Sequence, residues 1–186
     1  MKSLVASVDA LPAAQAAQVR ARVPSELLAA VAAGQGGDWL PMEANLALTR
    51  ALHAALGREA FRTFFRDHTL RSFRGPLFGP LFGALVRIVG TSPAGWASWV
   101  PRAWRLLFAD CGTWAVEDRG PGSVKLWFEQ APAACLEDEV WLDSVAASLA
   151  ALADVNRVLG DAELVSVDGA GSLAVFELRW TPSDAG

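Results

Sequence analysis

Hydrophobic and polar residues alternate in two pairs of short segments near the end of the chain, and a glycine-rich turn joins the members of each pair. Alternation with a period of two is typical of half-buried strands, and such turns favour hairpins. The pattern predicts strands at 113–117 and 124–130 around Arg119-Gly120-Pro121-Gly122, and strands at 163–167 and 172–180 around Asp168-Gly169-Ala170-Gly171. We therefore expect two β-hairpins.

A helical pattern separates the two hairpins. Apolar residues recur at Trp141, Val145, Leu149 and Leu152, which puts them on one face of a helix. We predict this helix over 136–159, with the acidic residues 137–139 in its first turn and a glycine at 160 as its stop. The order hairpin, helix, hairpin indicates an antiparallel sheet with the helix packed on it.

The first part of the chain has the period and the punctuation of short helices. Prolines and glycines delimit helices expected over 12–22, 25–34 and 41–56, with a loop at 36–38. The predicted fold class is α+β, with a helical N-terminal layer followed by the β-hairpin–helix–β-hairpin sheet. We expect one domain over 1–186, made of a helical region (1–57), aromatic and arginine-rich helices (58–110) and a ββαββ unit (111–181).

The segment 58–67 is a predicted helix with two distinct faces. Phenylalanines face inward, whereas arginines recur every four residues on the other side and are expected to form a solvated face; the residues are Phe61, Phe64, Phe65, Arg58, Arg62 and Arg66. A duplicated Gly-Pro-Leu-Phe at 75–82 predicts a turn or kink before a helix over 81–89. A further helix is expected from about 93 to 108, bent or divided by Pro101.

Charge is distributed unevenly along a chain whose net charge is −4. Residues 58–105 contain eight arginines against Glu59 and Asp67, whereas residues 106–186 contain fourteen acidic and four basic residues. The basic region has no nucleic-acid recognition motif, and its arginines are interleaved with core phenylalanines. The pattern favours docking of a basic helical layer on an acidic sheet layer, or contact between copies of the chain, over binding to nucleic acid.

Two apolar segments and two cysteines bear on the expected localisation and redox state of the protein. The initial apolar run is interrupted by Asp9 and is too short for a signal peptide, and the apolar stretch 76–90 is too short to span a membrane, so we expect a cytoplasmic protein without a transmembrane segment. The two cysteines, Cys111 and Cys135, are expected to be reduced there. They flank the open end of the first hairpin and could be neighbours.

No catalytic or metal-binding constellation stands out. The two histidines, His53 and His68, and the two cysteines lack the close spacing of zinc motifs, and His53 is expected to be a core or boundary residue. The sequence has no Gly-x-Ser-x-Gly and no phosphate-binding loop. We therefore expect no catalytic residue, no metal and no cofactor, and a protein that is not an enzyme.

A resemblance to a known superfamily rests on the order of elements and on two stretches. These are Leu106-Leu107-Phe108 running through Cys111-Gly112 into the first strand, and Phe176-Glu177-Leu178-Arg179-Trp180 at the end. With them the chain resembles the 4-vinyl-reductase and heme-NO-binding-related domains. From about residue 46 onward it also looks like a paralogous family of myxobacterial proteins of unknown function, which share a helix rich in Phe and Arg like 61–73 and a Pro-Arg-Ala-Trp-Arg-like helix as at 101–105.

The resemblance has a limit and an implication. The heme-binding branch is expected to have a Tyr-x-Ser-x-Arg motif, and this chain has no tyrosine. The resemblance thus favours the fold and disfavours heme. Relatives of this fold are thought to hold small or lipid-like molecules, which raises the case for a pocket.

The expected ligand site is therefore an apolar pocket in the aromatic helices, with an arginine for an acidic end of the ligand. Its predicted residues are Phe65, Phe73, Arg74, Phe78, Phe82, Trp96, Trp99, Arg102 and Trp104. The predicted function is a ligand-sensing or protein-interaction module that binds a small apolar or amphipathic molecule. The alternative is a structural or regulatory interaction domain, a homodimer or a partner-docking domain, without a ligand.

Overall fold

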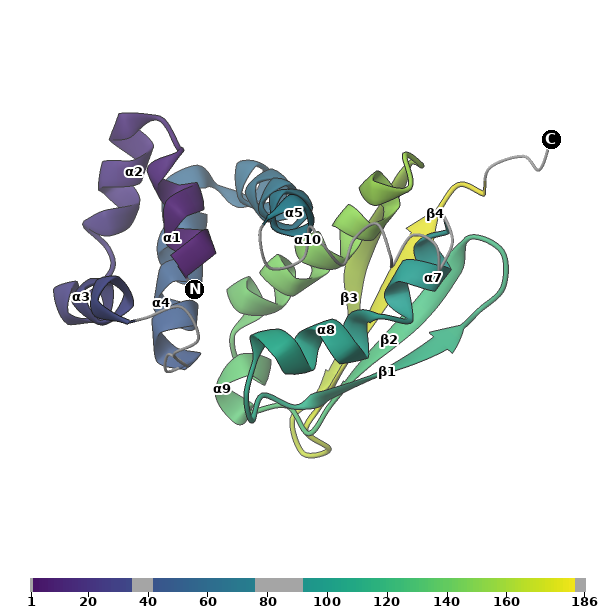
Figure 1. Ribbon diagram of the computed structural model, residues 1–186. Coiled ribbons are helices and arrows are strands. Elements are labelled where there is room, and N and C mark those ends of the chain that lie inside the picture. The colour runs from purple at the N-terminus through teal and green to yellow at the C-terminus, as the bar shows by residue number, and fades with distance from the viewer. Residues whose placement is uncertain (1, 35–41, 76–91, 183–186) are drawn as a thin grey trace. The chain divides into compact units, whose positions relative to one another are not determined.

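The computed structural model describes residues 2–34, 42–75 and 92–182 (Figure 1). The chain divides into two compact units, Met1–Phe64 and Phe65–Gly186. The helix α5 (Arg58–Arg74) belongs to both, because the division falls within it. The predicted loop at 36–38, the predicted helix over 81–89 and the duplicated motif after Gly75 lie outside the described residues.

The first unit is helical. It contains α1 (Lys2–Asp9), α2 (Ala13–Arg20), α3 (Ser25–Ala33), α4 (Met42–Leu56) and the start of α5. Gly57, with φ of 74°, separates α4 from α5, as the sequence predicted. Pro12 was expected in the first turn of its helix, but it is the N-cap of α2, which ends at Arg20, and Pro24 is the N-cap of α3. The first residues, which were interpreted only as a short apolar run, form α1 and bury Leu4 and Val8.

The second unit contains one antiparallel sheet of four strands. The strands β1 (Thr113–Asp118), β2 (Ser123–Glu129), β3 (Gly160–Asp168) and β4 (Leu173–Trp180) lie in the order β1-β2-β4-β3. Both predicted hairpins are confirmed, and β2 pairs with β4 at the centre of the sheet. The fold class is α+β, as predicted.

One face of the sheet forms the core. Alternate residues of β2 and their partners on β4 are almost completely buried; the cross-strand pairs are Val124–Leu178, Leu126–Phe176 and Phe128–Ala174. The opposite face of β2 carries Lys125, Trp127 and Glu129, as the alternation predicted. Burial on a single face accounts for the period of two in these strands.

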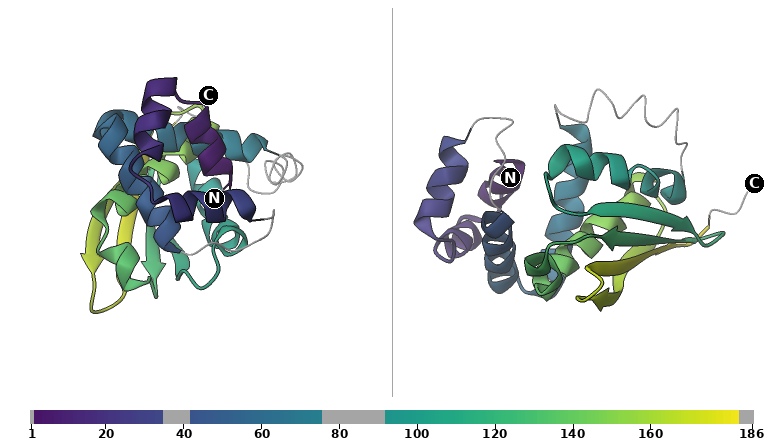
Figure 2. Two further views of the ribbon diagram at one scale, coloured as in Figure 1. Left: turned by 90° about the vertical axis from the view of Figure 1, so that its left-hand side faces the viewer. Right: turned by 90° about the horizontal axis from the view of Figure 1, so that it is seen from below.

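Helices cover the buried face. The short α9 (Ala133–Leu136) leads to α10 (Glu139–Val155), which runs along β3, while α7 (Pro93–Ala97) and α8 (Val100–Leu107) lie over β2 and β1 (Figures 1 and 2). The predicted stripe of α10 is buried, which confirms that this helix packs on the sheet. No helix among the described residues is long and apolar enough to cross a membrane.

The predicted ends of the long helix were wrong. The carboxylate of Asp138 accepts a hydrogen bond from the Trp141 amide, 3.0 Å away, so Asp138 is the N-cap. The helix α10 therefore begins at Glu139 and not at 136. The helix ends at Val155, because Arg157 adopts a φ of 57° and Val158 donates its amide to the Ala153 carbonyl. Gly160 is therefore the first residue of β3 and not a helix stop.

The predicted solvated arginine face of α5 was wrong at Arg66. Its guanidinium donates to both carboxylate oxygens of Asp154, at 2.7 and 3.0 Å, and to the Gly160 carbonyl at 3.3 Å. Asp161 lies 3.7 Å from the same guanidinium. The side chain is half-buried, and its contact with Asp154 raises the pKa of Arg66. This ion pair fastens the second half of α5 to the end of α10.

Candidate ligand site

The site is built on two short helices with defined starts. The hydroxyl of Ser92 accepts from the Gly95 amide at 3.1 Å and caps α7, which begins at Pro93. The predicted division of the longer helix is confirmed, and it falls at Ser98–Trp99 because Pro101 occupies the first turn of α8, where a missing amide hydrogen costs nothing. Both helices thereby place tryptophans over the sheet.

Trp104 of α8 enters an aromatic cluster. Its ring stacks on Phe108 with a centroid distance of 4.0 Å, and it meets Trp114, Phe128 and Trp141 edge-on at 5.5, 5.3 and 6.2 Å. Edge-to-face and offset-stacked arrangements at these distances are attractive. The cluster thus joins α8, β1, β2 and α10.

The two indole N–H groups of the cluster differ in their hydrogen bonding. Trp104 Nε1 donates to the Cys111 carbonyl at 2.7 Å. Trp114 is 6% exposed, and its buried Nε1 has no hydrogen-bond acceptor in the part of the chain that the structure describes. A buried donor without an acceptor is unfavourable, so this atom marks a place where an acceptor is needed.

The predicted site residues fall into separate contacts and not into one cluster. Phe73 packs on Trp96 at 5.6 Å, the Arg102 guanidinium lies 5.0 Å from the centroid of the Trp99 ring, and Phe65 meets the ring of His68 at 6.5 Å. The side chain of Arg74, together with Phe78 and Phe82, lies outside the described residues. The arginine near aromatic rings is the feature that an acidic end of a ligand requires.

Sequence reasoning did not include Trp114, Phe128 and Phe108 in the site. Trp114 is directly opposite Phe128 in the register of β1 and β2, so both side chains lie on the buried face. The alternation of β2 indicated the burial of Phe128, but contact with α8 depends on the tertiary packing of that helix. No pattern in the sequence indicated that Trp114 would lie on the buried face of the sheet.

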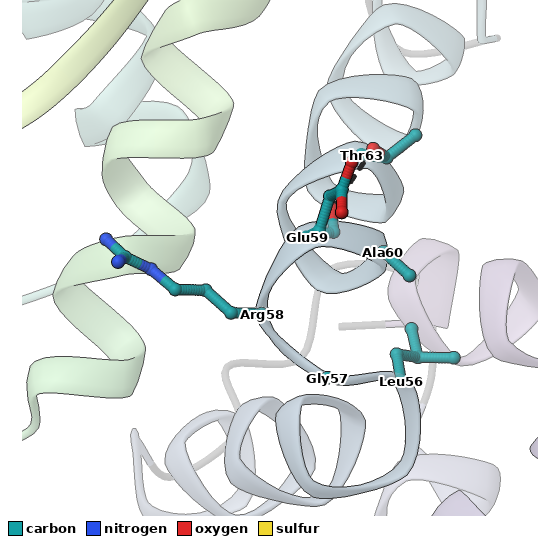
Figure 3. A pocket seen from close by; sticks show the side chains of 6 residues that line it. All are labelled: Leu56, Gly57, Arg58, Glu59, Ala60 and Thr63. Carbon is teal, nitrogen blue, oxygen red and sulfur yellow. Dashed lines mark hydrogen bonds between the residues drawn. The ribbon is translucent and has the colours of Figure 1, made fainter.

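A surface pocket lies elsewhere, at the junction of α4 and α5. It is open, has a volume of about 520 Å³ and is lined by Leu56, Gly57, Arg58, Glu59, Ala60 and Thr63. Figure 3 shows the Arg58 side chain pointing away from Glu59 and Thr63, and the Thr63 hydroxyl donates to the Glu59 carbonyl at 3.1 Å. These residues do not make a set of groups for acid–base or nucleophilic chemistry.

Two kinds of potential metal ligand have perturbed pKa values. Burial, and secondarily the charge of Arg71, lowers the pKa of the His68 imidazole to about 4. The thiol of Cys111 donates a hydrogen bond to that of Cys135, and this contact, together with burial, raises the pKa of Cys111. The predicted proximity of the two cysteines is confirmed, and both are free thiols. Within the described ranges no group of three or more His, Cys, Asp or Glu side chains could hold a metal ion.

Solved structures with a similar fold exist, whereas no protein-family model and no curated protein matches the sequence. The H-NOX protein from K. algicida in its Fe(II) unliganded form has a TM-score of 0.64 and 10% identity, and the match covers 100% of this chain and 96% of that one. An oxygen-binding H-NOX domain related to soluble guanylate cyclases has a TM-score of 0.62 and 8% identity, with 97% and 93% covered. The likeness shows a shared fold.

The donor set of this chain does not fit a heme. The two cysteine thiols are hydrogen-bonded to each other, and both histidine rings pack edge-on against phenylalanine rings, His53 against Phe61 at 5.1 Å and His68 against Phe65 at 6.5 Å. Trp104 stacks on Phe108 with ring centroids 4.0 Å apart, so a porphyrin could not lie between these two rings. An axial ligand at an open, apolar space is what a heme iron requires, and the described residues do not supply that combination.

Proposed function

We propose that this chain is a non-enzymatic ligand-sensing module that binds a small apolar or amphipathic molecule other than heme. The whole chain would act as a single domain, as the sequence suggested. Within the heme-NO-binding-related superfamily, the proposal places it with the 4-vinyl-reductase-like and myxobacterial branch. The likeness to an oxygen-binding H-NOX domain supports a role in sensing, because the match extends over nearly all of both chains.

The single observation that carries the proposal is the buried Trp114 N–H. It lacks an acceptor among the described residues and lies in a cluster of aromatic rings, where Trp104 is 5.5 Å away. A ligand with an apolar body and one oxygen acceptor would pack on the rings and accept this hydrogen bond. Apolar sites with one or a few placed polar groups are the usual form of small-molecule pockets.

The arginine on α8 suits an anionic end of such a ligand. Arg102 is exposed and lies over the Trp99 ring, so its charge is held beside an aromatic wall. The proposed ligand is therefore amphipathic, and a fatty-acid-like carboxylate is a suitable probe. The proposed lining adds Trp114 to the predicted set, which is Phe65, Phe73, Arg74, Phe78, Phe82, Trp96, Trp99, Arg102 and Trp104.

Replacing Trp114 by phenylalanine tests the role of the N–H in binding. The variant keeps an aromatic ring but removes the orphan N–H together with part of the indole ring, so the smaller side chain should cost the free protein about 1–2 kcal/mol in lost packing. Its affinity for dodecanoate should fall roughly fivefold to tenfold, the equivalent of one lost hydrogen bond. Isothermal titration calorimetry measures the affinity, and urea unfolding measures the stability.

Trp127→Phe is the matched control, because Trp127 is a half-exposed tryptophan on the opposite face of the sheet. This control should bind dodecanoate as the wild type does. Equal affinities for dodecanoate in wild type, Trp114→Phe and Trp127→Phe would contradict a role of the buried N–H in binding.

A specific observation favours a second candidate function, which is docking to a protein partner. Leu106 and Leu107 at the end of α8 are 63% and 46% exposed, next to the exposed Arg102 and Arg105. Adjacent exposed leucines beside exposed arginines are typical of interaction surfaces. Concentration-dependent sedimentation together with no dodecanoate binding would favour this alternative, a homodimer included.

A further inference from the structure

The two cysteines of the chain meet inside the second unit. Cys111 lies in the loop between α8 and β1 and is 3% exposed, while Cys135 lies in α9 and is fully buried. Their thiols are joined by a hydrogen bond. Each is the other's only possible intramolecular disulfide partner, because the sequence has two cysteines in all.

The backbone around Cys111 holds its side chain toward the interior. The residues on both sides have left-handed conformations, with φ of 51° at Asp110 and 65° at Gly112. The Cys111 carbonyl accepts from Trp104 Nε1 at 2.7 Å, which ties this loop to α8. On the other side the Cys135 amide donates to the Pro132 carbonyl at 2.9 Å within α9. The contact between the thiols is thus defined by two separately fixed segments.

The loop also offers a route to solvent. Ala109 and Asp110, directly before Cys111, are exposed, and so are Leu106 and Leu107 at the end of α8. Because Cys111 is 3% exposed, its thiol can react with a solute only after this loop opens. In the closed loop, burial and the hydrogen bond raise the pKa of Cys111 and keep the thiol neutral, so reaction has to follow opening.

We propose that Cys111 and Cys135 form a redox-modification site at which a low-molecular-weight disulfide, such as oxidised glutathione, converts the paired thiols into an intramolecular disulfide. The Cys111 thiolate attacks one sulfur of oxidised glutathione, and the first glutathione leaves as a thiolate that takes up a proton. The Cys135 thiolate then attacks the Cys111 sulfur and displaces the second glutathione. Two protein thiols are oxidised, and one glutathione disulfide is reduced to two thiols.

The bond would lock the α8–β1 loop to α9, at the point where the chain enters α10. It closes a loop of about two dozen residues, which restricts the unfolded chain and stabilises the folded one. It also fixes the Cys111 carbonyl opposite Trp104. This inference is independent of the proposed ligand, because it rests on the thiol pair and its two supporting segments.

The test uses the reduced full chain with an excess of oxidised glutathione, followed by acid quenching and intact mass measurement. The expected product has lost about two mass units, carries no glutathione and is monomeric. Its melting temperature should rise by roughly 5 °C or more and return to the starting value with dithiothreitol. Cys135→Ser should instead stop at a stable glutathione adduct on Cys111.

Several outcomes would overturn the proposal. These are a lasting glutathione adduct in the wild type, a disulfide-linked dimer, or thiols that react only in urea. A monomeric product that has lost two mass units but melts at a lower temperature would also do so, because that bond would need a non-native arrangement. Trp104→Phe, which lacks the bond to the Cys111 carbonyl, should react several-fold faster than the wild type.

Discussion

Replacing Gly112 by alanine should lower the free energy of unfolding by about 3 kcal/mol. A Cβ at this position would lie 2.7 Å from the Glu129 carbonyl oxygen and 2.8 Å from a ring carbon of Phe128, and both atoms belong to the central strand β2. The φ of 65° adds backbone strain for any residue with a side chain. Urea unfolding, followed by circular dichroism, measures the loss.

Gly120→Ala is the control that measures the cost of a positive φ for alanine without a steric clash. Gly120 has a φ of 94° in the turn between β1 and β2, and a Cβ there would meet nothing within 4 Å. Its expected cost is about 1 kcal/mol, from the left-handed conformation alone. Equal costs for the two substitutions would contradict the close approach of the Cys111–Gly112 loop to β2.

The protein should lose up to about 3 kcal/mol of stability as the pH falls from 6.5 to 4, because of His68. The pKa of its imidazole is lowered from 6.5 to about 4 in the folded state, chiefly by burial. In that window the unfolded chain binds a proton that the folded chain does not, so lowering the pH favours unfolding. Above pH 6.5 His68 no longer contributes to the pH dependence of stability, because it is neutral in both the folded and the unfolded chain.

His68→Gln should remove this part of the pH dependence, whereas His53→Gln, which keeps His68, should retain it. Urea unfolding of the three proteins at several pH values between 4 and 7 measures the slopes. A nuclear magnetic resonance titration of the His68 ring gives its pKa directly. A His68→Gln slope equal to that of the wild type would contradict the burial of the ring.

Local sequence patterns predicted the sheet well, because its turns and its alternation are local signals. Gly120 and Gly122 adopt positive φ angles in the first turn, and the Asp168 carboxylate accepts from the Gly171 amide at 3.0 Å in the second. The inward alternation of β2 and β4 then follows from burial on one face. These features depend only on residues a few positions apart.

Features that depend on distant residues were beyond the same reasoning. The repeat of arginines on α5 suggested solvation, but Arg66 meets Asp154 on a helix 88 positions away in the sequence. The end of α10 depends on the left-handed conformation of Arg157, a residue type that carries no such preference. A glycine a few residues later was therefore taken for the stop.

The candidate site was predictable only in outline. The aromatic richness of α7 and α8 was visible, yet the pairing of Trp104 with Trp114 and Phe128 requires the register of β1 and the position of α8 together. The orphan N–H of Trp114 is likewise a property of tertiary packing. Composition indicated which residue types would line a site, and it could not indicate which of them share a contact.

This chain shares the H-NOX fold, and we propose that it holds an apolar or amphipathic molecule in place of a heme. Native mass spectrometry of the untagged chain, purified from its own host, tests it most directly. We expect a population heavier than the bare chain by one small molecule, which gas-phase activation releases, and no species that carries a heme. A chain with one heme, or a chain found only at its bare mass, would contradict it.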